Sequence, residues 1–129
     1  MKKKVTLIYL FTIVLLLSST INVQSDSPTP PQPKYPAPDL IVWPSSQNIG
    51  PGPGGVAVWN FSIQGGSGTY KVTLTFGDSC GSITYSNIRP GEVRQISHTF
   101  DCGYSTIYNQ TWKAVGFGGP IYEYSVVTR

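Results

Sequence analysis

Thr69-Tyr70-Lys71-Val72-Thr73-Leu74-Thr75-Phe76 is the stretch that decides the fold. Its large apolar side chains stand at every second position: Tyr70, Val72, Leu74 and Phe76. Because successive side chains of a β-strand point to opposite faces, this alternation predicts a strand with one buried and one solvated face. Gly65-Gly66-Ser67-Gly68 before it and Gly77-Asp78 after it are typical of turns.

The same period-two pattern recurs on both sides of this strand. It predicts further strands at residues 40–43, 56–63, 82–85, 93–100, 106–115 and 121–128. Residues 45–55 are expected to form a loop, because they follow Pro44 and contain several glycines and prolines. From Asp39 onward, no long segment has apolar residues at three- and four-residue spacing, so no helix is predicted there.

About seven short strands with regular turns predict an all-β protein, an immunoglobulin-like two-sheet β-sandwich. One sheet alone cannot bury the large aromatic side chains that fall on the apolar faces, and two stacked sheets can. These residues are Trp59, Phe61, Tyr70, Phe76, Phe100 and Trp112. A partly closed barrel is the structural alternative.

The N-terminus predicts export. Three lysines follow Met1, and thirteen residues without charge, 5–17, come next, which is the length of a signal-peptide core. We expect a signal peptide at residues 1–25, cleaved before Asp26, and a secreted, extracellular protein. An uncleaved segment would instead retain the protein at the cell surface, because extending the window to Val23 approaches the length of a membrane-spanning helix.

The rest of the chain divides by composition. Residues 26–38 contain six prolines, which predicts an extended, flexible Pro-rich segment. Residues 39–129 form the predicted sandwich domain. The formal net charge of +3 comes from the three N-terminal lysines, so the mature protein is near neutral. Nucleic acid is therefore not an expected partner, nor is a membrane after cleavage, and we expect a monomer.

Cys80 and Cys102 are the only cysteines, and in an oxidising compartment such a pair usually bonds. We therefore predict a disulfide, with two free thiols or a redox or metal pair as the alternatives. Only His98 could join the cysteines as a soft ligand, and this spacing matches no zinc pattern. No metal and no cofactor are predicted.

Two segments resemble PKD-type immunoglobulin-like domains. Residues 65–78 are similar to the part of that family that runs from a Gly-rich turn through a strand to a Phe-Gly-Asp turn. Residues 97–100, Ser-His-Thr-Phe, resemble the His-x-aromatic strand that follows. The family's Trp-Asp is Leu74-Thr75 here, and the cysteine pair is an addition. The resemblance implies a spacer or binding module without chemistry of its own.

Catalysis is the competing interpretation, and it centres on His98. As a general base for a serine it would be oriented by Asp78 or Asp101, but the chain has no Gly-x-Ser-x-Gly elbow. Carboxylate pairs for glycoside cleavage would come from Asp78, Glu92, Asp101 and Glu123. Asp78 with Asp101 could hold Ca²⁺, though no ligand-rich loop is present. We predict no catalytic residue and no enzyme.

Aromatic residues are the candidate ligand-binding side chains. Five of them are Tyr104, Tyr108, Trp112, Tyr122 and Tyr124. Tyr122 and Tyr124 share one strand face, and Tyr108 or Trp112 could lie across from them. An exposed strip would bind sugar rings or a protein, whereas a buried one belongs to the core.

Three functions remain from the sequence. The first is a secreted, non-catalytic module that binds a carbohydrate or protein ligand. The second is a secreted effector or inhibitor of another protein, with contacts from the glycine-rich loops at 50–55 and 116–119. The third is a small hydrolase that uses His98.

Overall fold

Strands make up most of the described chain. The computed structural model describes residue 31 and residues 34–129, which contain eight strands and no helix. The strands are β1 (Asp39–Trp43), β2 (Ser46–Asn48), β3 (Gly55–Gln64), β4 (Tyr70–Thr75), β5 (Ser82–Ile88), β6 (Val93–Phe100), β7 (Ile107–Gly116) and β8 (Gly119–Thr128). The described part has no helix long and apolar enough to cross a membrane. The predicted signal peptide at 1–25 lies outside the described residues.

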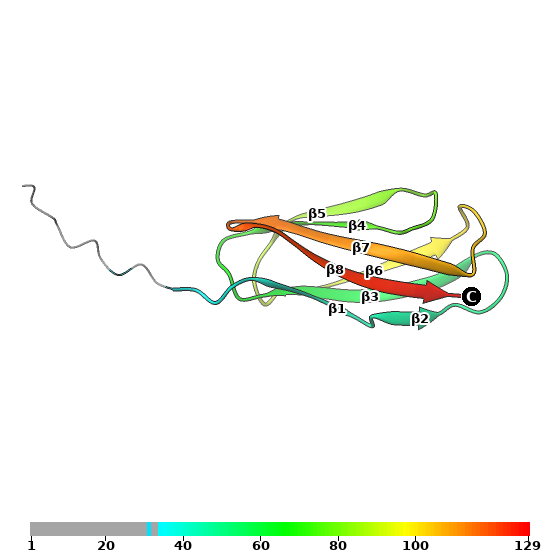
Figure 1. Cartoon of the computed structure of the whole chain (residues 1–129), viewed down its shortest axis with the longest axis horizontal. Helices are drawn as coiled ribbons and strands as arrows, with labels where there is room; N and C mark the ends of the chain where they lie inside the picture. The colour runs from blue at the N-terminus through cyan, green and yellow to red at the C-terminus, as the bar shows by residue number, and fades with distance from the viewer. Residues whose placement is uncertain (1–30, 32–33) are drawn as a thin grey trace, which may run out of the picture. The chain divides into compact units, whose positions relative to one another are not determined.

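The strands form two sheets. A three-stranded sheet has the order β1-β3-β6, and a five-stranded sheet has the order β2-β8-β7-β4-β5 (Figure 1). Only β4-β5 and β7-β8 are hairpins within one sheet, and every other connection passes from one sheet to the other. The predicted all-β, immunoglobulin-like two-sheet sandwich is confirmed, and neither sheet closes into a barrel.

β2 is the eighth strand, and it lies where a loop was expected. The prediction that residues 45–55 form one continuous loop is wrong at Ser46–Asn48, which pair in parallel with Val126–Thr128 of β8. Pro44 ends β1, and the chain then crosses to the other sheet. Three polar residues give no alternation signal, so this strand exists only because the edge of β8 offers unpaired backbone groups.

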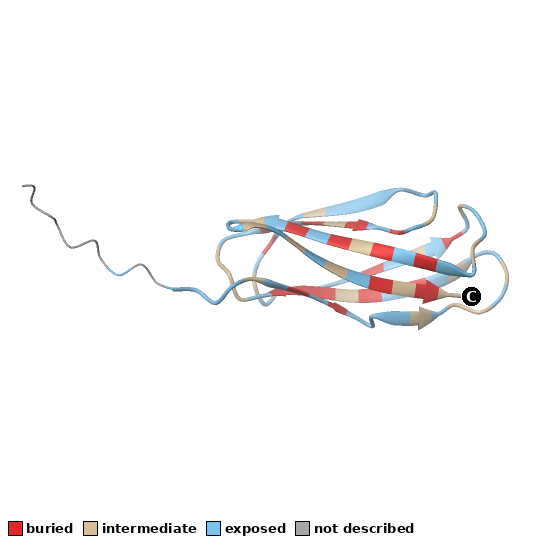
Figure 2. Cartoon of the chain, in the orientation of Figure 1, coloured by how far each residue is buried: buried red, intermediate tan, exposed pale blue. Residues whose placement is uncertain are grey.

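The core lies between the sheets, and buried residues alternate with more exposed ones along β1, β4 and β7 (Figure 2). Trp59 of β3 is at its centre and is fully buried. Its ring meets those of Trp112 and Phe100 edge-on, with centroids 6.0 and 6.3 Å apart. Such T-shaped contacts place the positive edge of one ring against the negative face of another. The predicted core aromatics are all buried.

A buried polar network crosses the five-stranded sheet. Trp112 Nε1 donates to Ser125 Oγ over 3.0 Å, and Ser125 Oγ donates to Gln110 Oε1 over 3.2 Å. The Gln110 amide donates to the carbonyls of Phe76 and Tyr108, each over 3.0 Å. Because each group has a partner, the network avoids the cost of desolvated, unpaired polar atoms.

The turn after β4 needs glycine. Gly77 has a φ of 80°, and a Cβ there would lie 2.2 Å from the Asn109 carbonyl oxygen. A side chain would therefore meet both backbone strain and a clash with β7. This close approach brings the following residue, Asp78, to the end of the sandwich.

Residues 34–38, the described end of the Pro-rich segment, contain no strand or helix. The Pro36 carbonyl accepts a hydrogen bond from the Gly66 N–H over 2.7 Å. This contact joins the end of the segment to the turn between β3 and β4.

Candidate functional site

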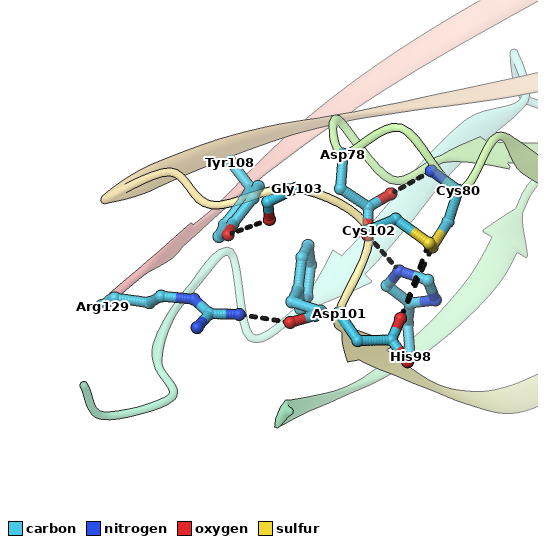
Figure 3. Close-up of a disulfide and its surroundings, with 9 residues drawn as sticks. Asp78, Cys80, His98, Asp101, Cys102, Gly103, Tyr108 and Arg129 are labelled. Carbon is cyan, nitrogen blue, oxygen red and sulfur yellow. Dashed lines mark hydrogen bonds and ion pairs between the residues drawn. A yellow bond between two sulfur atoms is a disulfide. The ribbon is translucent and has the colours of Figure 1, made fainter. Parts of the chain in front are cut away.

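Cys80 and Cys102 form a disulfide, with Cα atoms 5.4 Å apart (Figure 3). Cys80 lies between β4 and β5 of the five-stranded sheet, and Cys102 follows β6 of the three-stranded sheet. The Ser79 N–H donates to the Cys102 carbonyl over 3.1 Å beside it. The predicted bond is present, and it joins the two sheets at one end of the sandwich.

His98 and Asp78 are hydrogen-bonded to each other next to this disulfide. His98 Nε2 lies 2.7 Å from Asp78 Oδ2, and the two side chains are 12% and 0% exposed (Figure 3). The other carboxylate oxygen accepts the Cys80 N–H over 3.1 Å. The His98 ring stacks on Phe76, with centroids 3.6 Å apart. The segments that carry the PKD-type resemblance, 65–78 and 97–100, therefore touch here.

The surroundings of His98 and Asp78 give the hydrogen bond between them a structural role. Nε2 of His98 faces Asp78, and within the described residues no serine hydroxyl is hydrogen-bonded to the ring. A triad needs one ring nitrogen on the carboxylate and the other on a nucleophile. Phe100 approaches the ring edge-on, with centroids 4.8 Å apart. The pair ties the turn after β4 to β6.

Two groups of side chains near the disulfide have ligand atoms within 4.8 Å of one another: Asp78, Cys80 and His98, and Cys80, Asp101 and Cys102. Sulfurs in a disulfide are not thiolates, so neither offers zinc its usual soft ligand. Asp101 Oδ1 lies 3.7 and 3.6 Å from the two sulfurs. These contacts are not hydrogen bonds, because the bonded sulfurs carry no proton. Without the sulfurs, the first group offers a metal ion the Asp78 carboxylate and the His98 imidazole. The second group offers only the Asp101 carboxylate.

Glu92 immediately precedes β6, whereas the disulfide lies beyond the other end of that strand. Its carboxylate accepts the Arg89 N–H over 3.1 Å and pairs with Arg94 at 2.5 Å. The hydrogen bond from the Arg89 backbone lowers the pKa of Glu92, and Arg94 lowers it further, against an opposing effect of desolvation. Glu92 thus stabilises the turn formed by residues 89–92. Glu123 lies on β8, where its carboxylate accepts the N–H of Tyr124.

The five aromatic candidates divide between core and surface. Trp112 and Tyr108 are buried, at 0% and 2% exposed. Tyr104, Tyr122 and Tyr124 are 72%, 49% and 62% exposed. The prediction that Tyr108 or Trp112 lies across from Tyr122 and Tyr124 is wrong, because both side chains point into the core. Only the three exposed tyrosines are available to a ligand.

Tyr104 is separate from the other two. It lies between β6 and β7, and the guanidinium of Arg129 is 5.5 Å from the ring centroids of both Tyr104 and Tyr108. Arg129 also donates to the Phe100 carbonyl (Figure 3). The Tyr104 ring is therefore already in contact with Arg129 of the same chain.

Tyr122 and Tyr124 belong to the outer surface of the five-stranded sheet. Strand register places their side chains in two rows that cross β5, β4, β7 and β8: Ser82-Thr75-Thr111-Tyr124 and Thr84-Thr73-Lys113-Tyr122. We call these eight residues the tyrosine face. Residues directly paired across antiparallel strands share a face and lie about 5 Å apart, so each row is continuous.

Contacts within the tyrosine face support this register. The hydroxyls of Thr73 and Thr84 lie 3.0 Å apart, and Lys113 Nζ lies 5.8 Å from the Tyr122 ring centroid. The two tyrosines were predicted from the sequence, whereas Lys113 and Thr111 were not. The signal was the alternation of residues 106–115: if Trp112 points inward, both of its neighbours point outward.

No protein-family model matches the chain, and no curated protein matches it significantly. The assignment of a site therefore depends on the geometry described above.

Proposed function

We propose that this protein is an exported, non-catalytic binding module whose ligand contacts the tyrosine face. The observation that carries the proposal is the exposure of Tyr122 and Tyr124, side by side on one strand. Large exposed aromatic side chains that adjoin one another mark interaction surfaces more often than isolated ones do. Tyrosine offers a large contact area and loses little conformational entropy when it binds.

The sheet beneath the tyrosine face supports this role. Four of its five strands, β5, β4, β7 and β8, are joined by antiparallel pairing, and the inner faces of β4 and β7 are buried against the core. A site on rigid strands needs little ordering when a ligand binds, which reduces the entropic cost of association.

The surroundings of His98 support the absence of catalysis. The residue that a hydrolase would use is held against Asp78 and stacked on Phe76, at the end of the sandwich beside the disulfide. The His98 ring on β6 contacts Phe76, which follows β4, so this contact links the two sheets. A relationship to PKD-type domains is also part of the proposal, supported by the contact between residues 65–78 and 97–100.

Export predicts a defined mass for the protein recovered from the culture medium. Because cleavage is expected before Asp26, the intact chain should begin at that residue and should weigh two hydrogens less than the reduced chain. Mass spectrometry before and after reduction checks both. A chain that begins at Met1 and stays with the cells would contradict secretion in favour of surface retention.

Alanine at Tyr122 or Tyr124 is expected to weaken ligand binding at least about tenfold, which corresponds to about 1.4 kcal/mol. Each ring would supply a flat apolar contact that alanine cannot replace. The measurement is binding of the purified protein to an array of immobilised polysaccharides, followed by titration of those it retains.

Trp43→Ala is the matched control, because Trp43 is an exposed aromatic residue on β1 of the other sheet. It should leave binding unchanged. Equal loss in Trp43→Ala would move the site off the tyrosine face. Breakdown of a retained polysaccharide, abolished by His98→Ala, would show the protein to be an enzyme.

A second candidate function is favoured by Phe117. This residue is 85% exposed at the tip of the hairpin between β7 and β8, flanked by Gly116 and Gly118. An aromatic side chain presented on a projecting turn suits insertion into a pocket of a target protein, as expected of an inhibitor. Phe117→Ala would abolish binding in that case and would leave binding through the tyrosine face intact.

A further inference from the structure

The charges on the outer surface of the five-stranded sheet are of one sign. Lys71 of β4 and Lys113 of β7 are both exposed, and they are the only basic residues in β4, β5, β7 and β8. Glu123 is the only acidic residue in these strands. Its register partner is the buried Trp112, so Glu123 belongs to the opposite face from the tyrosines. Within these four described strands, the outer surface therefore carries two positive charges and no negative one.

The two lysines are neighbours. Lys113 pairs with Thr73, and Lys71 is two residues from Thr73 on the same strand. Diagonal neighbours of this kind lie about 7–8 Å apart. Lys113 also lies directly across from Tyr122, and its ammonium group is near that ring. Positive charge and aromatic surface are thus combined in one place.

The tyrosines have a spacing that suits a repeating ligand. Tyr122 and Tyr124 are two residues apart on β8, which places their Cα atoms about 7 Å apart along the strand. A linear chain that follows β8 would place its rings over the two tyrosines. Groups on one side of that chain would then project over β7, where the half-buried Thr111 offers a hydroxyl and the exposed Lys113 offers a positive charge.

We infer that the ligand of the tyrosine face is an acidic polysaccharide, whose sugar rings stack on Tyr122 and Tyr124 and whose carboxylates pair with Lys113 and Lys71. This inference rests on the proposed function, because it uses the same face. Sugar rings present flat C–H surfaces to aromatic rings and hydroxyls to threonine side chains. Opposite charge across an interface favours association and register, and here the protein supplies only the positive partner.

The composition of the face favours a glycan over a protein. Protein interfaces are depleted of lysine at their centres and are more apolar there. The rows that end at the tyrosines contain hydroxyls and a lysine instead. Exposed apolar residues occur on both sheets, with Trp43 and Val58 on the three-stranded sheet and Ile107 and Val115 on β7, outside the two rows.

The experiment compares three polymers by isothermal titration of the purified protein at low and physiological salt. The probes are polygalacturonate, a neutral linear glucan and polyglutamate. Polygalacturonate is expected to bind at least about tenfold more tightly than either comparison polymer at low salt. The glucan lacks the charges and polyglutamate lacks the rings. Salt should weaken polygalacturonate binding and leave glucan binding unchanged, because screening acts on charged contacts.

Variants separate this inference from the proposed function. Lys113→Gln should weaken polygalacturonate binding about tenfold and leave glucan binding unaltered, whereas Tyr124→Ala should weaken both. Lys34→Gln, which changes an exposed lysine before β1, is the matched control and should change neither. Equal affinity for glucan and polygalacturonate would overturn the inference and leave the proposed function standing. Equal affinity for polyglutamate and polygalacturonate would also overturn it. Binding that Tyr124→Ala does not weaken would overturn both.

Discussion

Alanine at Trp112 is expected to lower the free energy of unfolding by about 4 kcal/mol, because deletion of a large buried aromatic side chain loses its transfer free energy and leaves a cavity. Trp112 is fully buried and packs against Trp59 and Phe61 from the opposite sheet. Native proteins have a total stability of about 5–15 kcal/mol, so the loss would be a large fraction of the total. Urea denaturation followed by circular dichroism measures the change.

A matched pair of phenylalanine variants separates packing from hydrogen bonding. Trp112 Nε1 donates to Ser125, whereas Trp59 Nε1 is buried and has no hydrogen-bond partner among the described residues. Trp112→Phe removes the N–H that donates to Ser125 Oγ, so this buried hydroxyl loses a hydrogen bond. Trp59→Phe removes a buried N–H that has no partner among the described residues. We expect Trp112→Phe to cost about 1–2 kcal/mol more than Trp59→Phe. Equal costs would show that the network through Ser125 contributes nothing to stability.

Replacement of both Cys80 and Cys102 by serine is expected to lower stability by about 3 kcal/mol, because the bond closes a loop with a sequence separation of 22 and restricts the unfolded chain. For a domain of this size the loss corresponds to a fall in Tm of roughly 15 °C. Thermal unfolding of the oxidised protein, the reduced protein and the double variant measures it.

The reduced protein is the control for the double variant, because it lacks the bond and keeps both sulfurs. The two should unfold at similar temperatures, well below the oxidised form. Near-equal melting of the oxidised and reduced forms would contradict the prediction, and would mean that the contacts around Asp78 and His98 hold the two sheets together without the bond.

Alternation alone predicted most of the strands. Residues 69–76 predicted β4, and residues 56–63 predicted β3 with Trp59 and Phe61 facing inward, as observed. This success has a simple cause: in a sandwich one side of each strand faces the core, so burial must repeat with period two. β2 could not be predicted in this way, because Ser46–Asn48 are polar and depend on pairing with a distant strand.

The candidate site was predicted less completely. Tyr122 and Tyr124 were named from their spacing on one strand, and both are exposed. Lys113 and Thr111 were missed, because their place beside the tyrosines depends on the register of β7 with β8. A shift of that register by one residue would have placed Trp112 beside a tyrosine instead.

The sequence by itself determined the strand character of residues 39–129, the inward face of strands such as β3 and β4, and the cysteine pair, because periodicity and covalent chemistry are local properties. Only the tertiary structure decided which strands share a sheet, that His98 meets Asp78 and Phe76 beside the disulfide, and that two lysines and two tyrosines adjoin on one face. These contacts join residues far apart in the chain. Their formation depends on strand pairing and on the packing of the two sheets, which no local pattern encodes.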